Sequence, residues 1–353
     1  MPLLARSVQT PLHVQVRRGA VADLGRILAD GRISSGGEVA VVVGPGLGER
    51  IVDLLRPSLQ SATVHVTTGG TLDAALELAA KLRSGHYDAV VGIGGGKTVD
   101  TAKYAASRWG LPMISVATSL ANDGIASPVS SLVNDGIKGS YGVHIPFGVI
   151  VDLDFVENGP DRVNRAGIGD VISNISALAD WELARQVRGE PVDGIAASLA
   201  RMGAEAILSM PGDLSDDTFV TTLAEALISS GLAMAVSGSS RPCSGGCHEI
   251  IHATDSLFPD TASHGELAGL GALFCTFLRG DEPRFRQMAA CLARHQLPRT
   301  PSDVGLDAEQ FARVVQFAPR TRPDRYTILE HLAMTPEQIR QKLAEYDDVL
   351  TAL

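Results

Sequence analysis

The chain has 353 residues, of which 45% are hydrophobic, and it carries a formal net charge of −10 without a basic run. This length indicates two domains with a sizeable core, and the acidic balance argues against nucleic acid as the main partner. Four cysteines are too few for a disulfide scaffold, and no signal peptide is recognisable at the start of the sequence. The most apolar run, residues 219–236, is interrupted by Glu225, so we expect no membrane insertion. The low number of cysteines predicts a reducing, cytoplasmic location.

The first part of the chain alternates between predicted strands and predicted helices. Residues 13–16 alternate apolar and polar side chains as an edge strand does, whereas EVAVVV at 38–43 is typical of a buried parallel strand. Strands that alternate with helices form a parallel sheet covered on both faces, so residues 1–157 are predicted to be an α/β domain. The predicted strands are residues 13–16, 38–43, 63–68, 88–93, 113–117 and 147–151, with helices at 21–28, 51–59 and 72–82.

The composition changes after about Glu157. Long segments rich in alanine and leucine follow, without a convincing strand pattern. Residues 158–353 are therefore predicted to form an all-helical domain, and ligands of such a pair of domains usually bind in the cleft between them. The predicted helices are residues 161–188, 192–208, 215–236, 244–257, 264–279 and 282–295, with more near the C-terminus.

A glycine-rich stretch, GIGGGKTVD at residues 92–100, follows a predicted strand and opens a helix. Glycines let backbone N–H groups close on a phosphate, and the N-terminus of a helix favours its negative charge. The stretch is not a P-loop, because Val91 stands where the first glycine is needed. It is not a strict dinucleotide fingerprint either, because Lys97 takes the place of the third glycine. A phosphate-binding loop is the functional interpretation, and a structural turn is the alternative.

Three histidines lie close together in residues 240–264. His248 and His252 are four residues apart and share one face of a predicted helix, and His264 follows. Neutral imidazole is the commonest metal ligand, but a metal site needs three or four donors, and H-x-x-x-H alone is weak evidence. The residues by themselves leave both a metal site and a helix with two ordinary histidines open.

Five sequence blocks, in order between residues 92 and 332, carry a resemblance to a known family. GIGGGKTVDTAK resembles the pyrophosphate loop of the superfamily that contains iron-containing alcohol dehydrogenases, glycerol dehydrogenase and dehydroquinate synthase. ATSLANDGIASP and AGIGDVISNISALADWELA resemble segments of its glycerol-1-phosphate dehydrogenase group, and SRPCSGGCHEIIH and DRYTILEHL resemble later blocks. The resemblance implies a dehydroquinate synthase-like fold: a Rossmann-like parallel sheet followed by helices. It implies oxidation and reduction of a small hydroxy-ketone and its alcohol, dihydroxyacetone phosphate and sn-glycerol 1-phosphate first among them.

The family resemblance also supplies a metal-ligand set. In the family one aspartate and two histidines bind the metal, and these positions fall on Asp170, His248 and His264. Zinc is usual in the glycerol-1-phosphate group, and iron is the alternative. One carboxylate and two imidazoles leave coordination positions open, as a catalytic site requires. For Asp170 alone, a helix-capping residue after Gly169 is the structural alternative.

The same resemblance implies contacts to NAD or NADP. Thr118, Ser119 and Ser127 fall near the ribose and nicotinamide, Asp123 on a substrate-binding position and His252 on a second histidine near the substrate. Asp123 before Gly124 could also be an ordinary turn residue. The nucleotide-loop positions are Gly94, Gly95, Gly96, Lys97 and Asp100.

Three positions depart from the family pattern and bear on which substrate the protein accepts. Ala121 stands where the family has serine, Asn122 where it has histidine or serine, and Cys247 where glutamate is common. A dehydrogenase of another polyol or hydroxy-ketone is therefore an alternative. A substrate phosphate would need basic donors, for which Lys138 and Arg241 are the nearest candidates in the sequence. We expect a homo-oligomer, a dimer or higher.

Other classes of protein remain as alternatives. Cys243 and Cys247 with two histidines could form a structural zinc site, although the flexible SGG between the cysteines disfavours closure. A sugar-phosphate cyclase of the same superfamily has glutamate in place of the aspartate ligand, so Asp170 argues against it. A non-catalytic relative that binds only a nucleotide is a further alternative. The intact metal-ligand set of Asp170, His248 and His264 argues against it.

Overall fold

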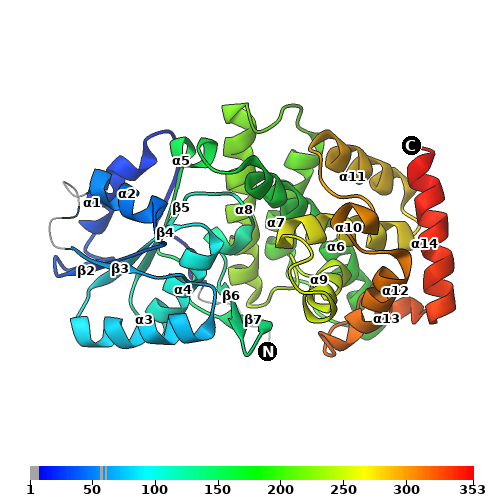
Figure 1. Cartoon of the computed structure of the whole chain (residues 1–353), viewed down its shortest axis with the longest axis horizontal. Coiled ribbons are helices and arrows are strands. Elements are labelled where there is room, and N and C mark those ends of the chain that lie inside the picture. The colour runs from blue at the N-terminus through cyan, green and yellow to red at the C-terminus, as the bar shows by residue number, and fades with distance from the viewer. Residues whose placement is uncertain (1–7, 56–58, 60–61) are drawn as a thin grey trace.

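The structure is a computed structural model that describes residues 8–55, 59 and 62–353. Figure 1 shows an elongated molecule in which the sheet lies at one end and a bundle of helices at the other. Every neighbouring pair of strands in the six-stranded sheet, ordered β1-β8-β5-β4-β2-β3, is parallel. The strands are β1 (His13–Arg17), β2 (Val39–Val43), β3 (Ala62–Val66), β4 (Ala89–Gly94), β5 (Met113–Ala117) and β8 (Gly148–Asp152).

Burial explains why these segments are strands. The side chains of β2, β5 and β8 are buried along their whole length, as is nearly all of β4, which fits their continuous apolar runs. β1 and β3 form the two edges and keep some exposed positions. All six strands were predicted, and the expected parallel α/β sheet is confirmed. The helices beside the sheet are α1 (Leu24–Leu28), α2 (Leu47–Leu55), α3 (Leu72–Gly85) and α4 (Gly96–Ser107).

An antiparallel hairpin, formed by β6 (Val129–Asn134) and β7 (Ile137–Gly142), was not predicted from the sequence. Its turn contains Asp135 and Gly136, both with positive φ, at 50° and 76°. An Asp-Gly pair of this kind is the usual chemistry of a tight hairpin turn. The strand pattern is weak because serine and glycine interrupt the apolar alternation. The hairpin extends beyond the sheet and contacts α9 (Gly246–Leu257) of the helical half (Figure 1).

The second part of the described chain, after β8, is helical. The segments predicted from residue 161 to residue 295 match α6–α11 to within a turn, so the all-helical character is confirmed. The helices are α5 (Leu153–Glu157), α6 (Asp161–Arg188), α7 (Gly194–Ser209), α8 (Asp217–Ser237), α9 (Gly246–Leu257), α10 (His264–Leu278), α11 (Glu282–Arg294), α12 (Ala308–Phe317), α13 (Ile328–Leu332) and α14 (Pro336–Thr351). The boundary between two domains at residues 157 and 158 stays a prediction.

Helix α8 is long and apolar enough to cross a membrane by length and composition, although our sequence analysis expected no such segment. In the folded protein 61% of its most apolar window is buried. It packs against α6, α7 and the short 3₁₀ helix η3 (Asp123–Ile125). Because core helices pass the same hydropathy test, this packing accounts for the apolar composition of α8 without a membrane.

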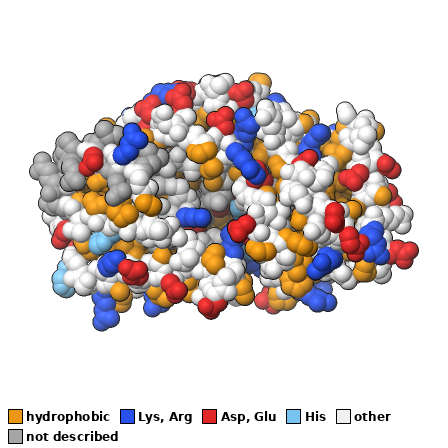
Figure 2. Space-filling model, viewed as in Figure 1, with side chains coloured by type: hydrophobic (Ala, Val, Ile, Leu, Met, Phe, Trp, Pro, Cys, Tyr) orange, Lys and Arg blue, Asp and Glu red, His pale blue; other side chains and the backbone are white. Residues whose placement is uncertain are grey.

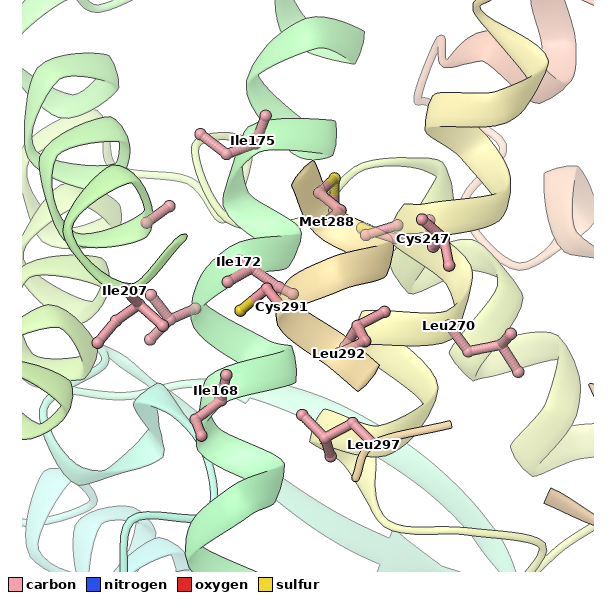
Figure 3. Close-up of a cluster of buried hydrophobic side chains, with 14 of the residues drawn as sticks. Ile168, Ile172, Ile175, Ile207, Cys247, Leu270, Met288, Cys291, Leu292 and Leu297 are labelled. Atoms are coloured by element: carbon pink, nitrogen blue, oxygen red, sulfur yellow. The ribbon is translucent and has the colours of Figure 1, made fainter. Parts of the chain in front are cut away.

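One hydrophobic cluster joins the sheet to the helices. It contains Ala117 and Val151 from the sheet together with residues of α5–α14. Figure 3 shows part of this cluster, where Ile172 of α6 lies beside Cys291 and Leu292 of α11. The continuous core holds the carboxyl ends of the strands against the helices.

Two glycines bring α6 and α10 unusually close. A Cβ atom on Gly265 would lie 1.9 Å from the carbonyl oxygen of Ala166, and one on Gly169 would lie 2.2 Å from the carbonyl oxygen of Gly265. Any larger residue would therefore force the two helix backbones apart. Each glycine is the neighbour of a predicted metal ligand, Asp170 or His264, so this close approach sets the distance between those ligands.

Candidate functional site

A cavity of about 1000 Å³ lies between the sheet and the helical half. The glycine loop after β4, the β6–β7 hairpin and the start of α9 and α10 all contribute to its lining. Figure 2 shows the surface hollowed between the two halves, with Lys and Arg side chains along the hollow. The cavity lies at the end of the sheet where the strands finish, which is where ligands of parallel sheets bind.

The three predicted metal ligands come together in this region. Asp170 lies on α6, His248 on α9 and His264 at the first residue of α10, and one donor atom from each lies within 4.8 Å of the others. Asp170 Oδ1 is 3.4 Å from His264 Nε2, and the two imidazole ring centres are 5.1 Å apart. Within the described residues this is the one group of three His, Cys, Asp or Glu side chains close enough to hold a metal ion.

The electrostatics of the three residues suit a cation. Burial lowers the pKa of His248 well below its usual value and that of His264 to about 3, so both imidazoles are neutral near pH 7. Neutral imidazole is the form that binds a metal. Burial also raises the pKa of Asp170 well above the usual aspartate value, because the carboxylate lacks a compensating charge there. A divalent ion would supply that charge, so the donor set fits a metal.

Asp123 is adjacent to the ligand cluster and is held there by the backbone. Its N–H donates to Asp170 Oδ2 at 2.9 Å, and its side chain lines the cavity. Burial raises the pKa of Asp123 to about 7. The side chain of Asn122 accepts from the N–H of Gly124 at 2.9 Å and so caps η3. This turn places Asp123 at the cavity wall, next to the predicted metal ligands.

Lys103 is a buried organising residue that sequence reasoning missed. It is fully buried, and its ammonium group donates to the carbonyl oxygens of Gly124, Ser127 and Val129. It also forms an ion pair with Asp100 Oδ1 at 2.9 Å. Lys103 therefore ties the turn that carries Asp123 to helix α4. It is the last residue of the GIGGGKTVDTAK block, which was the available signal.

Some of the predicted nucleotide-binding residues line the cavity, and others lie behind its wall. The lining residues are Gly96, Lys97, Asp100 and Ser127. Gly94 has φ of 156°, and Gly95 precedes α4 as its N-cap residue, so the loop turns directly into the helix N-terminus. The loop is therefore shaped to bring backbone N–H groups to a phosphate.

Thr118 and Ser119 lie beside the loop rather than on the cavity wall. Thr118 donates its N–H to the carbonyl oxygen of Gly94 at 3.1 Å. A Cβ atom on Gly95 would lie 3.3 Å from Ser119 Oγ. Both residues are buried, and they support the loop from the neighbouring strand β5. Asp100 likewise has a structural partner in Lys103, and its carboxylate accepts from the N–H of Ser131 at 3.2 Å.

One end of the cavity is basic. His252 lies one turn after His248 on α9, and Arg322 Nη2 donates to His252 Nε2 at 2.9 Å. Burial, reinforced by Arg322, lowers the pKa of His252 to about 3, so this histidine is neutral and accepts at Nε2. Lys138 of β7 also lines this end and forms an ion pair with Asp255 at 3.3 Å.

Arg241 was the wrong candidate for a basic donor in the cavity. Its guanidinium makes two hydrogen bonds to the Glu190 carboxylate, both at 2.7 Å, and a third to the carbonyl oxygen of Tyr326. It is buried and is absent from the cavity lining. Arg322, which is far away in the sequence, occupies the position that Arg241 was expected to take, and only its nearness to the DRYTILEHL block could have pointed to it.

Cys247 does not face the substrate region either. Its side chain is fully buried in the hydrophobic core, and Figure 3 shows it on the side of α9 that faces Met288. Burial raises the pKa of its thiol to about 12, and its sulfur lies 3.9 Å from the carbonyl oxygen of Ser173. The departure from the family at Cys247 therefore concerns packing and the contact of its sulfur with His248 Nδ1 at 3.3 Å, whereas Ala121 and Asn122 do line the cavity.

A buried carboxylate fixes the start of α9. Asp180 accepts from the N–H of Gly246 at 2.8 Å and from the N–H of Ile328 at 2.7 Å, and it is paired with Arg279. Because Gly246 is the first residue of α9, Asp180 sets the position of the helix that carries His248 and His252. The sequence signal was the position of Asp180 within the AGIGDVISNISALADWELA block, but no role for it was predicted.

Comparisons with known proteins agree with this architecture. The profile of the iron-containing alcohol dehydrogenase family matches residues 15–160. The chain is 36% identical over 351 residues to a glycerol-1-phosphate dehydrogenase of Hyperthermus butylicus, covering 97% of this chain and 99% of that protein. It is 35% identical over 335 residues to one from Methanospirillum hungatei, covering 92% and 90%.

Solved structures share the fold. A probable glycerol dehydrogenase from Sinorhizobium meliloti superposes with a TM-score of 0.77 at 20% identity and covers 99% of this chain and 100% of that one. Glycerol dehydrogenase from Schizosaccharomyces pombe gives the same TM-score at 21% identity, with 99% and 92% covered. Together with the family profile, the full-length relatives define an oxidoreductase of the iron-containing alcohol dehydrogenase class. Within that class, the chain belongs to the glycerol-1-phosphate dehydrogenase family.

Proposed function

We propose that this protein is a metal-dependent, NAD(P)-linked oxidoreductase that interconverts dihydroxyacetone phosphate and sn-glycerol 1-phosphate. The observation that carries the proposal is the cluster of Asp170, His248 and His264 beside the cavity that the glycine loop also lines. A reaction that moves hydride between a nicotinamide and a carbonyl carbon needs the nucleotide loop and the residues that would hold the metal to lie side by side. The names of the curated relatives give the same substrate and the same cofactors.

The nucleotide would bind along the loop of Gly94, Gly95, Gly96 and Lys97. Backbone N–H groups at the start of α4 would donate to a pyrophosphate, and the helix N-terminus adds partial positive charge. Lys97 lines the cavity, and within the described residues no carboxylate lies within ion-pair distance of it. Its ammonium group is therefore available to a phosphate.

The metal would be held by Asp170, His248 and His264, as zinc or alternatively as iron. When bound, the ion supplies Lewis-acid polarisation of the substrate oxygen, and the nicotinamide supplies the hydride. Asp123 is placed to bind a substrate hydroxyl, because it lines the cavity and is fixed by its N–H bond to Asp170. His252, kept neutral by burial and by Arg322, orients a second hydroxyl or relays a proton.

The protein is further proposed to act in the cytoplasm as a homo-oligomer without membrane insertion, as residues 1–157 and 158–353 folded into two domains. The burial of α8 supports the absence of a membrane span.

The cofactor pocket is expected to accept NADP(H) as well as NAD(H). An acid at the end of an early strand binds the ribose 2′-hydroxyl in many NAD enzymes and repels a 2′-phosphate. Here β2 ends at Val43 and is followed by Gly44 and Pro45, so no such acid stands at the strand end. Steady-state kinetics with both reduced cofactors test this. A preference for NAD(H) above about a hundredfold, roughly 2.7 kcal/mol, would contradict the prediction.

Dihydroxyacetone phosphate is expected to be reduced by the native protein, or by the Ala121→Ser variant if the missing hydroxyl limits turnover. An unmade hydrogen bond in a buried site costs about 1–3 kcal/mol, which slows a reaction without changing its type. The native Cys247 is retained, because a carboxylate at that position would be buried in the core. The assay follows loss of reduced nicotinamide with dihydroxyacetone phosphate, dihydroxyacetone and other hydroxy-ketones.

The same assay separates the alternatives. Reduction of another ketone but not of dihydroxyacetone phosphate, by either protein, would leave only the dehydrogenase class. Turnover of a sugar phosphate without net change in the cofactor would identify a cyclase.

A further inference from the structure

Arg322 and Lys138 approach the cavity from opposite halves of the molecule. Arg322 follows the short 3₁₀ helix η5 (Ala318–Arg320), and Lys138 lies on β7 of the hairpin. Both line the cavity, together with Ser140 and His252. Arg322 Nη2 is 3.3 Å from Ser140 Oγ, so the guanidinium already bridges the hairpin and α9.

The charge at this end of the cavity is not balanced. Within the described part of the chain, Arg322 has no carboxylate within ion-pair distance, and its two side-chain partners, His252 and Ser140, are neutral. Lys138 has one partner, Asp255. A partly buried guanidinium without a counter-charge is costly, and it is stabilised when an anion enters.

The chemistry of the pair selects the type of anion. A guanidinium presents donors in a planar fork that fits two oxygens of a phosphoryl group, and a lysine adds a mobile point charge. A serine hydroxyl supplies one more donor. Such a set suits a phosphate ester better than a single carboxylate, since it offers donors from three directions.

The distance to the metal ligands suits a small substrate. Arg322 contacts His252, which is one helical turn beyond His248 on the same face of α9. One turn is about 5.4 Å along the helix axis. A three-carbon ketone phosphate can therefore place its carbonyl at the ligand cluster and its phosphoryl group at Arg322.

We infer, on the basis of the proposed function, that Arg322, Lys138 and Ser140 form the subsite that binds the substrate phosphoryl group. The β6–β7 hairpin then does more than close the cavity, because its Lys138 and Ser140 select phosphorylated over unphosphorylated ketones. Asp255 holds Lys138 in reach of the subsite while it is empty. The glycine loop binds the phosphates of the nucleotide separately.

The test compares two substrates that differ only in the phosphate. The catalytic efficiency, kcat/KM, of the full-length metal-loaded protein is measured with dihydroxyacetone phosphate and with dihydroxyacetone. Arg322→Gln is expected to lower the value for the phosphate ester by roughly 10- to 100-fold, the range for a lost hydrogen bond to a charged group, and that for dihydroxyacetone by less than about threefold. Arg322→Lys is expected to retain part of the preference, because it keeps the charge but not the fork.

Inorganic phosphate provides a second probe that does not depend on turnover. Its binding to the native protein and to the variants is measured by calorimetry, and its inhibition of ketone reduction by kinetics. Arg322→Gln and Lys138→Gln are expected to weaken both by roughly tenfold or more. Arg320→Gln is the control, since Arg320 is exposed, lies two residues from Arg322 and is absent from the cavity lining.

Each outcome decides the question. Equal losses with both ketones would show that Arg322 acts only by orienting His252, and unchanged phosphate binding in both Gln variants would likewise overturn the subsite. If the native protein reduces some other ketone and not dihydroxyacetone phosphate, the proposed function fails, while phosphate inhibition of that other reaction still tests the subsite. If Arg322→Gln does not fold, Arg322→Lys and Lys138→Gln give the same comparison.

Discussion

Replacing His264 with alanine is expected to remove the bound metal and the activity together. His264 contributes one of the three donors, and a site with only Asp170 and His248 holds too few ligands for a divalent ion. The fold should survive, because Ser263 and Glu266 cap α10 without using the His264 side chain. The measurements are metal content by elemental analysis and ketone reduction by the same samples.

The matched control for this prediction is His331→Ala. His331 is exposed on α13, and its ring bonds to the hydroxyl of Tyr326 outside the cavity. This variant should keep both metal and activity. Full metal occupancy in the His264→Ala protein, with the fold verified by circular dichroism, would refute the ligand assignment.

The Gly265→Ala substitution is expected to destabilise the protein strongly and to weaken metal binding as well. The added methyl group would lie 1.9 Å from the carbonyl oxygen of Ala166, where the atoms of two helix backbones leave no room. Overpacking of a core typically costs 1–3 kcal/mol, and we expect about 3 kcal/mol or more here because backbone rather than side chain must move. As α6 and α10 separate, Asp170 moves away from His264.

Urea unfolding and metal titration test this prediction. Gly194→Ala is the control, because a Cβ atom at Gly194 meets nothing within 4 Å and the position is the first residue of α7. It should leave the free energy of unfolding nearly unchanged. A Gly265→Ala protein as stable as the native one would contradict the close approach of α6 and α10.

Much of the fold could be predicted because its signals are local. The six sheet strands carry short apolar runs bounded by turn residues, and α6–α11 carry long helical patterns, so periodicity was enough to find them. The β6–β7 hairpin escaped because its strands contain serine and glycine, although the Asp135-Gly136 turn was a readable signal.

The candidate site shows a similar division. The family resemblance predicted that Asp170, His248 and His264 bind one metal ion together. The structure places one donor atom of each residue within 4.8 Å of the other two. The spacing of His248 and His252 placed both on one helix, but only the resemblance and the fold connected them to Asp170. Cys247, the residue before His248, looked like a cavity-lining residue in the sequence, but in the structure it is buried in the core, from where its sulfur contacts His248 Nδ1.

The sequence by itself determined the class of fold, and it predicted a phosphate-binding glycine loop and, through its family blocks, a set of three metal ligands. These features depend on residues close together in the chain or on motifs that recur in relatives. Only the tertiary structure decided that Arg322 rather than Arg241 faces the cavity. It also decided that Lys103 binds the turn that carries Asp123 and that Asp180 fixes the first residue of α9. Their roles depend on contacts between residues far apart in the sequence, such as Arg322 with His252 and Asp180 with Gly246. Side chains of the same chemical type are interchangeable in a sequence pattern, whereas the packing of helices against the sheet gives each of them a different neighbour.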